Sequence, residues 1–212
     1  MTVTGSWFDG AFADSPIMAI LRGTGTDRAV RLAETAWNLG IDSVEVTIQS
    51  AEDEEALREV VRRASAQGKS VGAGTVLTRE QVRIASDAGA SFVVAPGFDP
   101  SIVDEAEALG MPVLPGVATP GEVQLAYARG LRWMKAFPAE WLGVGWFGHI
   151  RGPFPDVRFV ATGGLGAGNV SAFLDAGVRV AAVGSALEDP AQLALLAEIL
   201  RTRRGAGLGS AR

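Results

Sequence analysis

The sequence predicts a single (β/α)8 TIM barrel, and three observations lead to this fold class. Short apolar runs alternate with segments of helical pattern eight times between residues 16 and 204. Nearly every helical segment ends at a glycine, the residue that commonly follows the last turn of a helix. No linker or change in composition divides this region. Alternating strands and helices build a parallel sheet with right-handed crossovers, and eight such units in one domain close most naturally into a barrel.

The expected strands are short, apolar and rich in β-branched residues, as strands buried on both faces are. They are expected at residues 16–21, 43–48, 70–75, 91–95, 111–114, 131–135, 157–161 and 179–183. The helices are expected at residues 27–39, 52–67, 79–87, 101–109, 120–128, 141–151, 169–176 and 190–204. An open, doubly wound sheet is the alternative. It is disfavoured because no Gly-x-Gly-x-x-Gly motif follows the first strand.

The segments that flank the barrel have a different composition. Residues 1–15 carry Trp7, Phe8 and Phe12 among small and acidic residues. This pattern predicts a short N-terminal helix that packs on the domain or closes one end of it, and a disordered arm is the alternative. Residues 205–212 are rich in glycine and serine and are expected to form a flexible tail. The predicted organisation is one barrel domain over residues 16–204 with an arm and a tail.

The composition argues against several classes of function. The net charge is −5 and there is no basic run, so nucleic acid is not expected as a partner. Without cysteine, and with His149 as the single histidine, the chain lacks the residues for thiolate or multi-histidine metal sites. No signal-peptide pattern or apolar run of membrane-spanning length is found. We therefore expect a cytoplasmic protein that acts on a small molecule, without a metal or a membrane partner.

The ends of the expected strands carry the candidate site, because active sites of such barrels lie at the carboxyl ends of the strands. These ends supply one amine, one carboxylate, one guanidinium, several hydroxyls and two glycine-rich turns. The residues are Arg22, Glu45, Thr47, Gln49, Thr75, Pro96, Lys135, Thr162, Gly163, Gly164, Gly184 and Ser185. We expect them to converge on one site.

Lys135 ends a short apolar run and is followed closely by Phe137 and Pro138. Burying a lysine is unfavourable unless its charge is paired or lost, and burial favours the neutral amine that attacks carbonyl carbons. We hypothesise that Lys135 forms a Schiff base with a substrate. A side chain that reaches solvent from the strand end is the alternative.

Glu45 is the carboxylate expected beside this amine. Within its strand, Glu45, Thr47 and Gln49 share one face, and the apolar residues share the other. The polar face is expected to point into the barrel, toward Lys135 and the substrate. Glu45 is therefore a candidate general acid and base, and a structural ion pair with Arg22 or Lys135 is the alternative.

Two glycine-rich turns, at residues 162–164 and 184–185, follow the last two expected strands. Loops at these positions of a barrel commonly bind phosphate through backbone N–H groups and hydroxyls. These turns therefore predict a phosphate or carboxylate ligand.

Several segments resemble the class I aldolases that cleave 2-keto-3-deoxy-6-phosphogluconate (KDPG), 2-keto-3-deoxy-6-phosphogalactonate or 4-hydroxy-2-oxoglutarate. They are Ile20–Gly23, Val44–Thr47, Val71–Thr78, Ala95–Gly97, Leu114–Val117, Met134–Ala139, Gly152–Pro155, Val157–Phe159 and Ala161–Gly164. The resemblance extends from about residue 16 to residue 190. It implies a (β/α)8 barrel, usually a homotrimer, which uses no metal and no cofactor beyond the covalent Schiff base.

The resemblance also implies roles for individual residues. Lys135 matches the Schiff-base nucleophile and Glu45 matches the general acid and base. Thr75 falls where the family binds the substrate carboxylate, and Pro96 and Phe137 fall where it lines the pyruvyl pocket. The family's phosphate site matches Thr162, Gly163, Gly164, Gly184 and Ser185.

Gln49 departs from the pattern of many KDPG aldolases, which carry at this position an arginine that helps to bind the carboxylate. The galactonate-type branch carries an amide there, which leaves Arg22 as a candidate for the missing positive charge. A second departure is the aromatic segment 141–147. The resemblance implies cleavage of a phosphorylated 2-keto-4-hydroxy acid to pyruvate and glyceraldehyde 3-phosphate. The alternatives are release of glyoxylate from 4-hydroxy-2-oxoglutarate, or a phosphate-binding barrel enzyme without a covalent intermediate.

Overall fold

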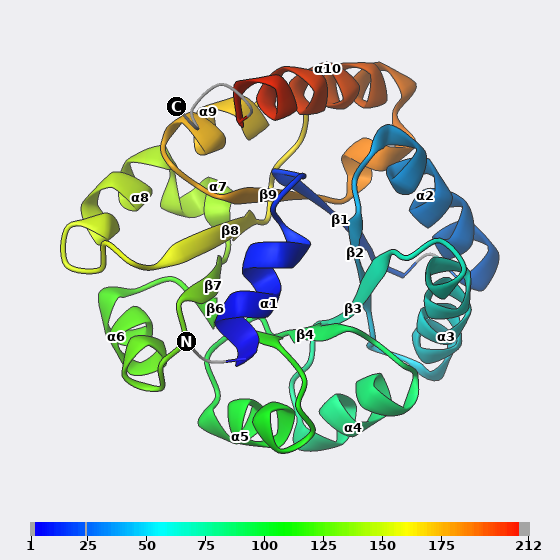
Figure 1. Ribbon diagram of the computed structural model, residues 1–212, viewed down its shortest axis with the longest axis horizontal. Helices are drawn as coiled ribbons and strands as arrows, with labels where there is room; N and C mark the ends of the chain where they lie inside the picture. Colours follow the sequence, from blue (N-terminus) through cyan, green and yellow to red (C-terminus); the bar gives the residue numbers. More distant parts are fainter. Residues whose placement is uncertain (1–2, 24, 208–212) are drawn as a thin grey trace.

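The computed structural model describes residues 3–23 and 25–207, and it has the predicted barrel architecture (Figure 1). The strands are β1 Ile17–Leu21, β2 Ser43–Thr47, β3 Ser70–Gly74, β4 Phe92–Val94, β5 Val113–Leu114, β6 Gly116–Val117, β7 Trp133–Ala136, β8 Arg158–Thr162 and β9 Val180–Val183. Within the described residues these nine parallel strands form a nearly closed barrel in the order β5-β4-β3-β2-β1-β9-β8-β7-β6.

The strand expected at residues 111–114 is observed as β5, and an additional short strand, β6, follows beyond the expected bounds, on the other side of Pro115. β5 pairs with β4, and β6 pairs with β7. Proline has no backbone N–H to donate, so it interrupts the ladder at this point. The barrel keeps the eight predicted strand positions, one of which is split.

The helices surround the barrel, except the N-terminal helix, which lies across one end of it (Figure 1). They are α1 Val3–Ala11, α2 Thr26–Leu39, α3 Ala51–Ser65, α4 Arg79–Asp87, α5 Pro100–Ala108, α6 Pro120–Ala128, α7 Ala139–Leu142, α8 Val144–Arg151, α9 Val170–Asp175 and α10 Pro190–Gly207, with a 3₁₀ helix, η1, at Ser185–Glu188. The helix expected at residues 141–151 is two helices, because Gly143 adopts a positive φ of 73° between them. Residues 205–207 of the predicted tail continue α10, and residues 208–212 lie outside the described part.

Polar caps fix the starts of four helices. The side chains of Ser50, Thr78, Asp99 and Thr119 accept backbone N–H bonds at the starts of α3, α4, α5 and α6. Such bonds satisfy backbone donors that a helix leaves unpaired in its first turn. Each cap therefore fixes the residue at which the loop after the preceding strand stops and the next helix begins.

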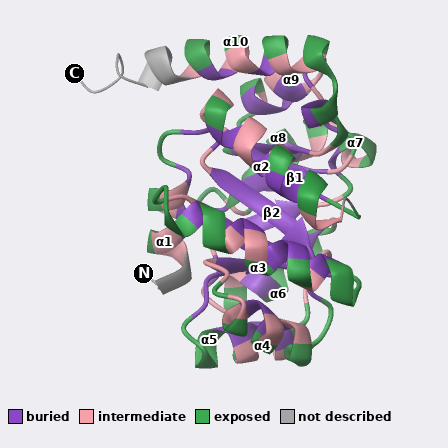
Figure 2. Cartoon of the chain, turned by 90° about the vertical axis from the view of Figure 1, so that its right-hand side faces the viewer, coloured by how far each residue is buried: buried purple, intermediate pink, exposed green. Residues whose placement is uncertain are grey.

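Two apolar clusters pack on opposite faces of the sheet, and the strands are almost entirely buried (Figure 2). The larger cluster, which includes Val44 and Met134, lies between the strands and the helices. The smaller cluster includes Phe92, Trp133 and Val160 from separate strands and fills the barrel interior. Packing on both faces explains why the strands are apolar on both sides.

The N-terminal helix α1 lies across the end of the barrel where the strands begin (Figure 1). Phe8 and Phe12 are buried and pack against Trp133, the first residue of β7. Asp9 accepts a 2.9 Å hydrogen bond from Trp133 Nε1 and pairs with Arg158, the first residue of β8. Burial opposes ionisation of Asp9, but these hydrogen bonds outweigh it and lower the pKa of the carboxyl group. α1 thus closes one end, and the candidate site lies toward the other.

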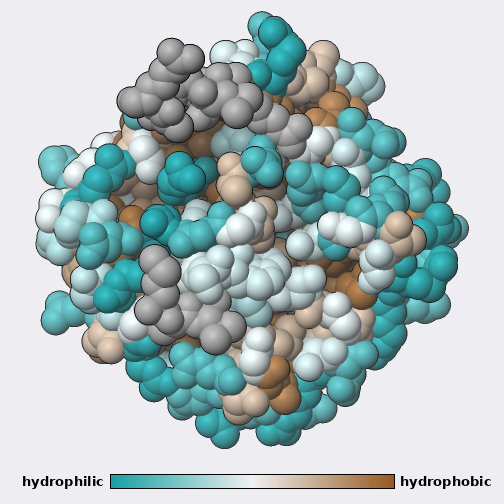
Figure 3. Space-filling view, in the orientation of Figure 1, coloured by the Kyte–Doolittle hydropathy of each residue, from teal (hydrophilic) through white to brown (hydrophobic). Residues whose placement is uncertain are grey.

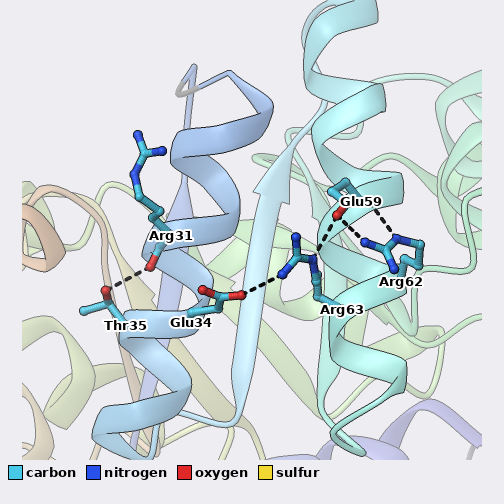
Figure 4. A network of polar contacts seen from close by, with 6 residues as sticks. All are labelled: Arg31, Glu34, Thr35, Glu59, Arg62 and Arg63. Atoms are coloured by element: carbon cyan, nitrogen blue, oxygen red, sulfur yellow. Dashed lines mark hydrogen bonds and ion pairs between the residues drawn. The ribbon is translucent and has the colours of Figure 1, made fainter.

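The outer surface is predominantly hydrophilic on the face shown in Figure 3. A network of Glu34, Arg63, Glu59 and Arg62 connects α2 with α3 (Figure 4). Hydrogen bonds from Arg62 and Arg63 lower the pKa of Glu59 to about 2. Because these side chains are in contact with solvent, their net contribution to stability is small. No described helix has both the length and the apolar composition that crossing a bilayer requires.

Candidate active site

Lys135 and Glu45 meet inside the barrel. Lys135 Nζ lies 3.7 Å from Glu45 Oε1, and the side chains are 2% and 0% exposed. The lysine therefore does not reach solvent, contrary to the alternative considered from the sequence. An ion pair between the two residues is present, and it brings an amine and a carboxylate together in a site from which water is largely excluded.

The alternation of side chains along two strands brings this pair together. On β2, Val44 and Val46 belong to the outer apolar cluster, so Glu45 between them points inward. On β7, Met134 belongs to the outer cluster, and Lys135 points inward. The Lys135 backbone N–H donates to Pro115 O at 2.8 Å, which fixes the height of the lysine in the barrel.

Two glycines of β3 leave space for inward side chains of the neighbouring strands, one of which is Glu45. A Cβ atom at Gly74 would lie 2.0 Å from Glu45 Oε1. A Cβ atom at Gly72 would lie 2.3 Å from the Phe92 ring. The alternating glycines of this strand are therefore explained by the bulk of inward side chains on its two neighbours.

Four buried polar atoms at the site have no hydrogen-bond partner among the described residues. They are Glu45 Oε1, Glu45 Oε2, Thr47 Oγ1 and Thr162 Oγ1. Buried polar groups are usually hydrogen-bonded, because leaving one without a partner is unfavourable. These atoms are available to bond a group that is not part of the protein.

Thr75 and Phe137 lie at the strand ends next to these residues. Thr75 directly follows β3 and has a φ of 58°, a left-handed conformation that threonine rarely adopts. Strain of this kind persists where the surrounding structure enforces it, and functional sites are enriched in it. The Phe137 ring centroid lies 5.4 Å from Lys135 Nζ, so its π face borders the amine.

A pocket of about 580 Å³ opens at the ends of β1, β8 and β9. It brings together seven of the predicted site residues. These are Arg22, Phe137, Thr162, Gly163, Gly164, Gly184 and Ser185. Both predicted glycine turns therefore line one cavity, as a shared anion site requires.

Hydrogen bonds hold the first of these turns in shape. Gly163 and Gly164 have positive φ angles of 99° and 75°, which favour glycine. The Gly163 carbonyl accepts from the Glu140 N–H, and the Gly164 carbonyl accepts from Asn169 Nδ2, both at 3.0 Å. The turn is thus anchored through both carbonyls.

Gln49 and Pro96 do not line this pocket. Gln49 is exposed, because β2 ends at Thr47 and the chain turns there into α3. Its backbone N–H donates to Asp53 Oδ2 at 3.1 Å as part of the start of that helix. The inward orientation expected from strand alternation therefore does not extend to this residue. Pro96 follows β4, and its carbonyl packs against Gly116, which has no room for a Cβ atom.

Sequence reasoning missed Glu188, which lines the same pocket as the glycine turns. It is the last residue of η1, three positions after Ser185, and this closeness to a predicted turn was the available signal. A second groove, of about 560 Å³, lies between α2 and α3, but it contains none of the predicted site residues. Within the described part of the chain, no three histidine, aspartate or glutamate side chains cluster as metal ligands would.

Comparison with known proteins relates the whole barrel to one enzyme family. The family model for KDPG and KHG aldolases, where KHG denotes 4-hydroxy-2-oxoglutarate, matches residues 9–199. The 2-dehydro-3-deoxy-phosphogluconate aldolase of Treponema pallidum is 38% identical over 178 residues, which cover 84% of this chain and 82% of the relative. A probable 2-dehydro-3-deoxy-6-phosphogalactonate aldolase of Rhizobium meliloti is 34% identical over 178 residues, which cover 84% of each.

Among solved structures, the KDPG aldolase of Legionella pneumophila superposes with a TM-score of 0.78 at 28% identity, over 91% of this chain and 95% of that one. That structure contains pyruvate captured as a covalent carbinolamine intermediate.

Proposed function

Because the chain belongs to the family of KDPG and KHG aldolases, and is therefore a lyase, we propose that it cleaves a 2-keto-4-hydroxy acid through a Schiff base on Lys135. The observation that carries this proposal is the buried contact of 3.7 Å between Lys135 Nζ and Glu45 Oε1. The covalent pyruvate intermediate of the Legionella relative supports the same chemistry.

The reaction begins at the amine of Lys135. The amine gives up a proton and attacks the C2 ketone of the substrate, and loss of water, which takes up that proton, gives an iminium ion. The iminium withdraws electrons from the C3–C4 bond. When a base removes the proton of the C4 hydroxyl, this bond breaks, an aldehyde leaves, and the enamine of pyruvate stays on Lys135. Protonation at C3 and hydrolysis then release pyruvate and restore the amine.

Glu45 is the base and acid for these proton transfers. Both of its carboxylate oxygens lack hydrogen-bond partners among the described residues, so both are available to the C4 hydroxyl and to C3. Its negative charge also lies beside the position where the iminium charge develops. One carboxylate therefore assists two steps, and the amine supplies the electron sink without a resident cofactor.

The substrate is proposed to extend from Lys135 toward the pocket at the ends of β8 and β9. Its pyruvyl end is bordered by Thr47, Thr75, Pro96 and Phe137, and Arg22, which lines the pocket, supplies positive charge for the anionic substrate. A phosphate at the other end is bound by the two glycine turns with Thr162 and Ser185. The names of the relatives favour KDPG or its galactonate isomer, which yield glyceraldehyde 3-phosphate. 4-Hydroxy-2-oxoglutarate, which yields glyoxylate, is the second candidate.

A pyruvate-release assay with these three substrates tests the proposal. The chain contains two lysines, so Lys69→Met is a matched control for Lys135→Met. Lys69 pairs with Asp42 away from the site. We expect Lys135→Met to abolish pyruvate release and Lys69→Met to retain it. Full activity in Lys135→Met would refute the covalent mechanism. The homotrimer and the cytoplasmic location are also proposed, and sedimentation and cell fractionation test them.

A further inference from the structure

Two of the described residues that line the pocket at the ends of β1, β8 and β9 carry charge, Arg22 and Glu188. Arg22 follows β1 and is suited to an anionic substrate. Glu188 ends η1 and places a carboxylate on the wall of a pocket for which an anion is proposed. The proposed mechanism gives this carboxylate no role, so its presence at this position needs another explanation.

Glu188 is not isolated at the rim of the pocket. Its carboxylate pairs with the guanidinium of Arg28, which belongs to α2, and the pair joins the segment after β9 to the helix after β1. The two side chains are 40% and 52% exposed. Glu188 lines the pocket whereas Arg28 does not. A ligand in the pocket therefore lies closer to the carboxylate of Glu188 than to the guanidinium of Arg28.

This arrangement penalises ligands in proportion to their negative charge. A phosphate ester carries a charge of about −1.5 to −2 at neutral pH, while a carboxylate carries a single negative charge. Repulsion from one fixed carboxylate is therefore greater for the phosphate. Specificity often arises in this way, from an element that disfavours one ligand rather than from one that attracts another.

We propose that Glu188 is a specificity-determining residue whose carboxylate weakens the preference of this pocket for phosphate over a less charged group, and that Arg28 limits this effect. The inference rests on the proposed function, because it assigns this pocket to the end of the substrate that leaves as the aldehyde.

Opposite substitutions of the ion pair test the proposal. The measured quantity is the ratio of kcat/KM for KDPG to kcat/KM for 4-hydroxy-2-oxoglutarate. We expect Glu188→Gln to raise this ratio roughly threefold to tenfold and Arg28→Gln to lower it by a similar factor. If the Arg28–Glu188 ion pair only stabilised the fold, both variants would change the ratio in the same direction, since each breaks the same pair. Glu105→Gln, which breaks the Arg83–Glu105 pair between α4 and α5, is the control and should leave the ratio unchanged.

Two results would overturn the inference: a lowered or unchanged ratio in Glu188→Gln, or equal shifts in both variants. Absence of pyruvate release by the unmodified protein from either substrate would instead contradict the proposed function. In that event, calorimetric titration tests the inference separately. It measures the dissociation constant of inorganic phosphate for the unmodified protein and for each variant. Tighter binding by Glu188→Gln and weaker binding by Arg28→Gln would support it, and equal dissociation constants would refute it.

Discussion

The carboxylate of Glu45 occupies the space that a side chain at Gly74 would need. A Cβ atom there would lie 2.0 Å from Glu45 Oε1, closer than any non-bonded contact allows. β3 thus leaves room for the carboxylate on one side, while Lys135 approaches it to 3.7 Å. The proposed catalytic pair depends on a residue that has no side chain.

Gly74→Ala should therefore impair catalysis without unfolding the protein. The added methyl group must displace the Glu45 carboxylate, and displacement of a catalytic group by about 1 Å can reduce a rate on the order of 100-fold. Pyruvate-release kinetics measure the effect. Gly148→Ala is the control, since a Cβ atom at Gly148 has nothing within 4 Å. Equal rates for both variants would show that the position of Glu45 does not depend on Gly74.

Glu45→Gln tests the acid and base role while keeping the size of the side chain. We expect kcat to fall by about 10² to 10⁴, the typical contribution of a positioned proton-transfer group. The amine of Lys135 remains, so pyruvate should still form a reducible adduct. Glu198→Gln, on the exposed face of α10, serves as the control. A Glu45→Gln enzyme with more than a tenth of the normal kcat would assign proton transfer to another group.

Thr75 offers a test of strain at the site. Its φ of 58° favours glycine, so Thr75→Gly should be more stable than Thr75→Ala by about 1 kcal/mol. Both variants lose the hydroxyl group and should therefore have a higher KM for the keto acid. Urea unfolding of the two variants measures the difference in stability. If Thr75→Ala were as stable as Thr75→Gly, the left-handed backbone conformation at position 75 would not reduce the free energy of unfolding.

Asp9 makes the stability of the barrel end depend on pH. Its pKa in the folded protein is lowered below the ordinary value of 3.8, so its contribution is fully present above that pH. The contribution is lost as the pH falls through the folded pKa. Asp9→Asn should thus destabilise the protein at pH 7, on the order of 1 kcal/mol because the pair is partly exposed.

The destabilisation caused by Asp9→Asn should shrink as the pH is lowered below about 4, since the wild-type carboxyl group then becomes neutral as well. Urea unfolding at a series of pH values measures this, with the exposed Asp156→Asn as the control. A destabilisation that stayed constant down to acidic pH would mean that the charge of Asp9 does not contribute to the stability of the folded protein.

Much of the fold could be predicted because the relevant signals are local. Apolar runs, helical patterns and terminal glycines identify the strands and helices, and alternation along β2 places Glu45 inside the barrel. The splits at Pro115 and Gly143 escaped prediction. A proline or glycine shows that regular structure is disturbed, but its effect depends on which neighbours the backbone meets in the folded chain.

The parts of the site that escaped prediction depend on contacts between distant segments. Alternation continued past Thr47 predicts an inward Gln49, but the backbone turns there to begin α3. The sequence does not predict a role for Glu188, because Glu188 lines the pocket only where η1 folds beside the end of β1. The function of Gly74 likewise depends on Glu45 of the adjacent strand, which periodicity alone does not reveal.

Borohydride reduction in the presence of pyruvate tests the covalent role of Lys135 most directly. The chain has two lysines, so peptide mass spectrometry can assign the adduct without ambiguity between lysine side chains. We predict a reduced pyruvyl adduct on the peptide that contains Lys135, retained in Lys69→Met and lost in Lys135→Met. An unmodified Lys135 peptide, or an adduct confined to Lys69, would contradict the account.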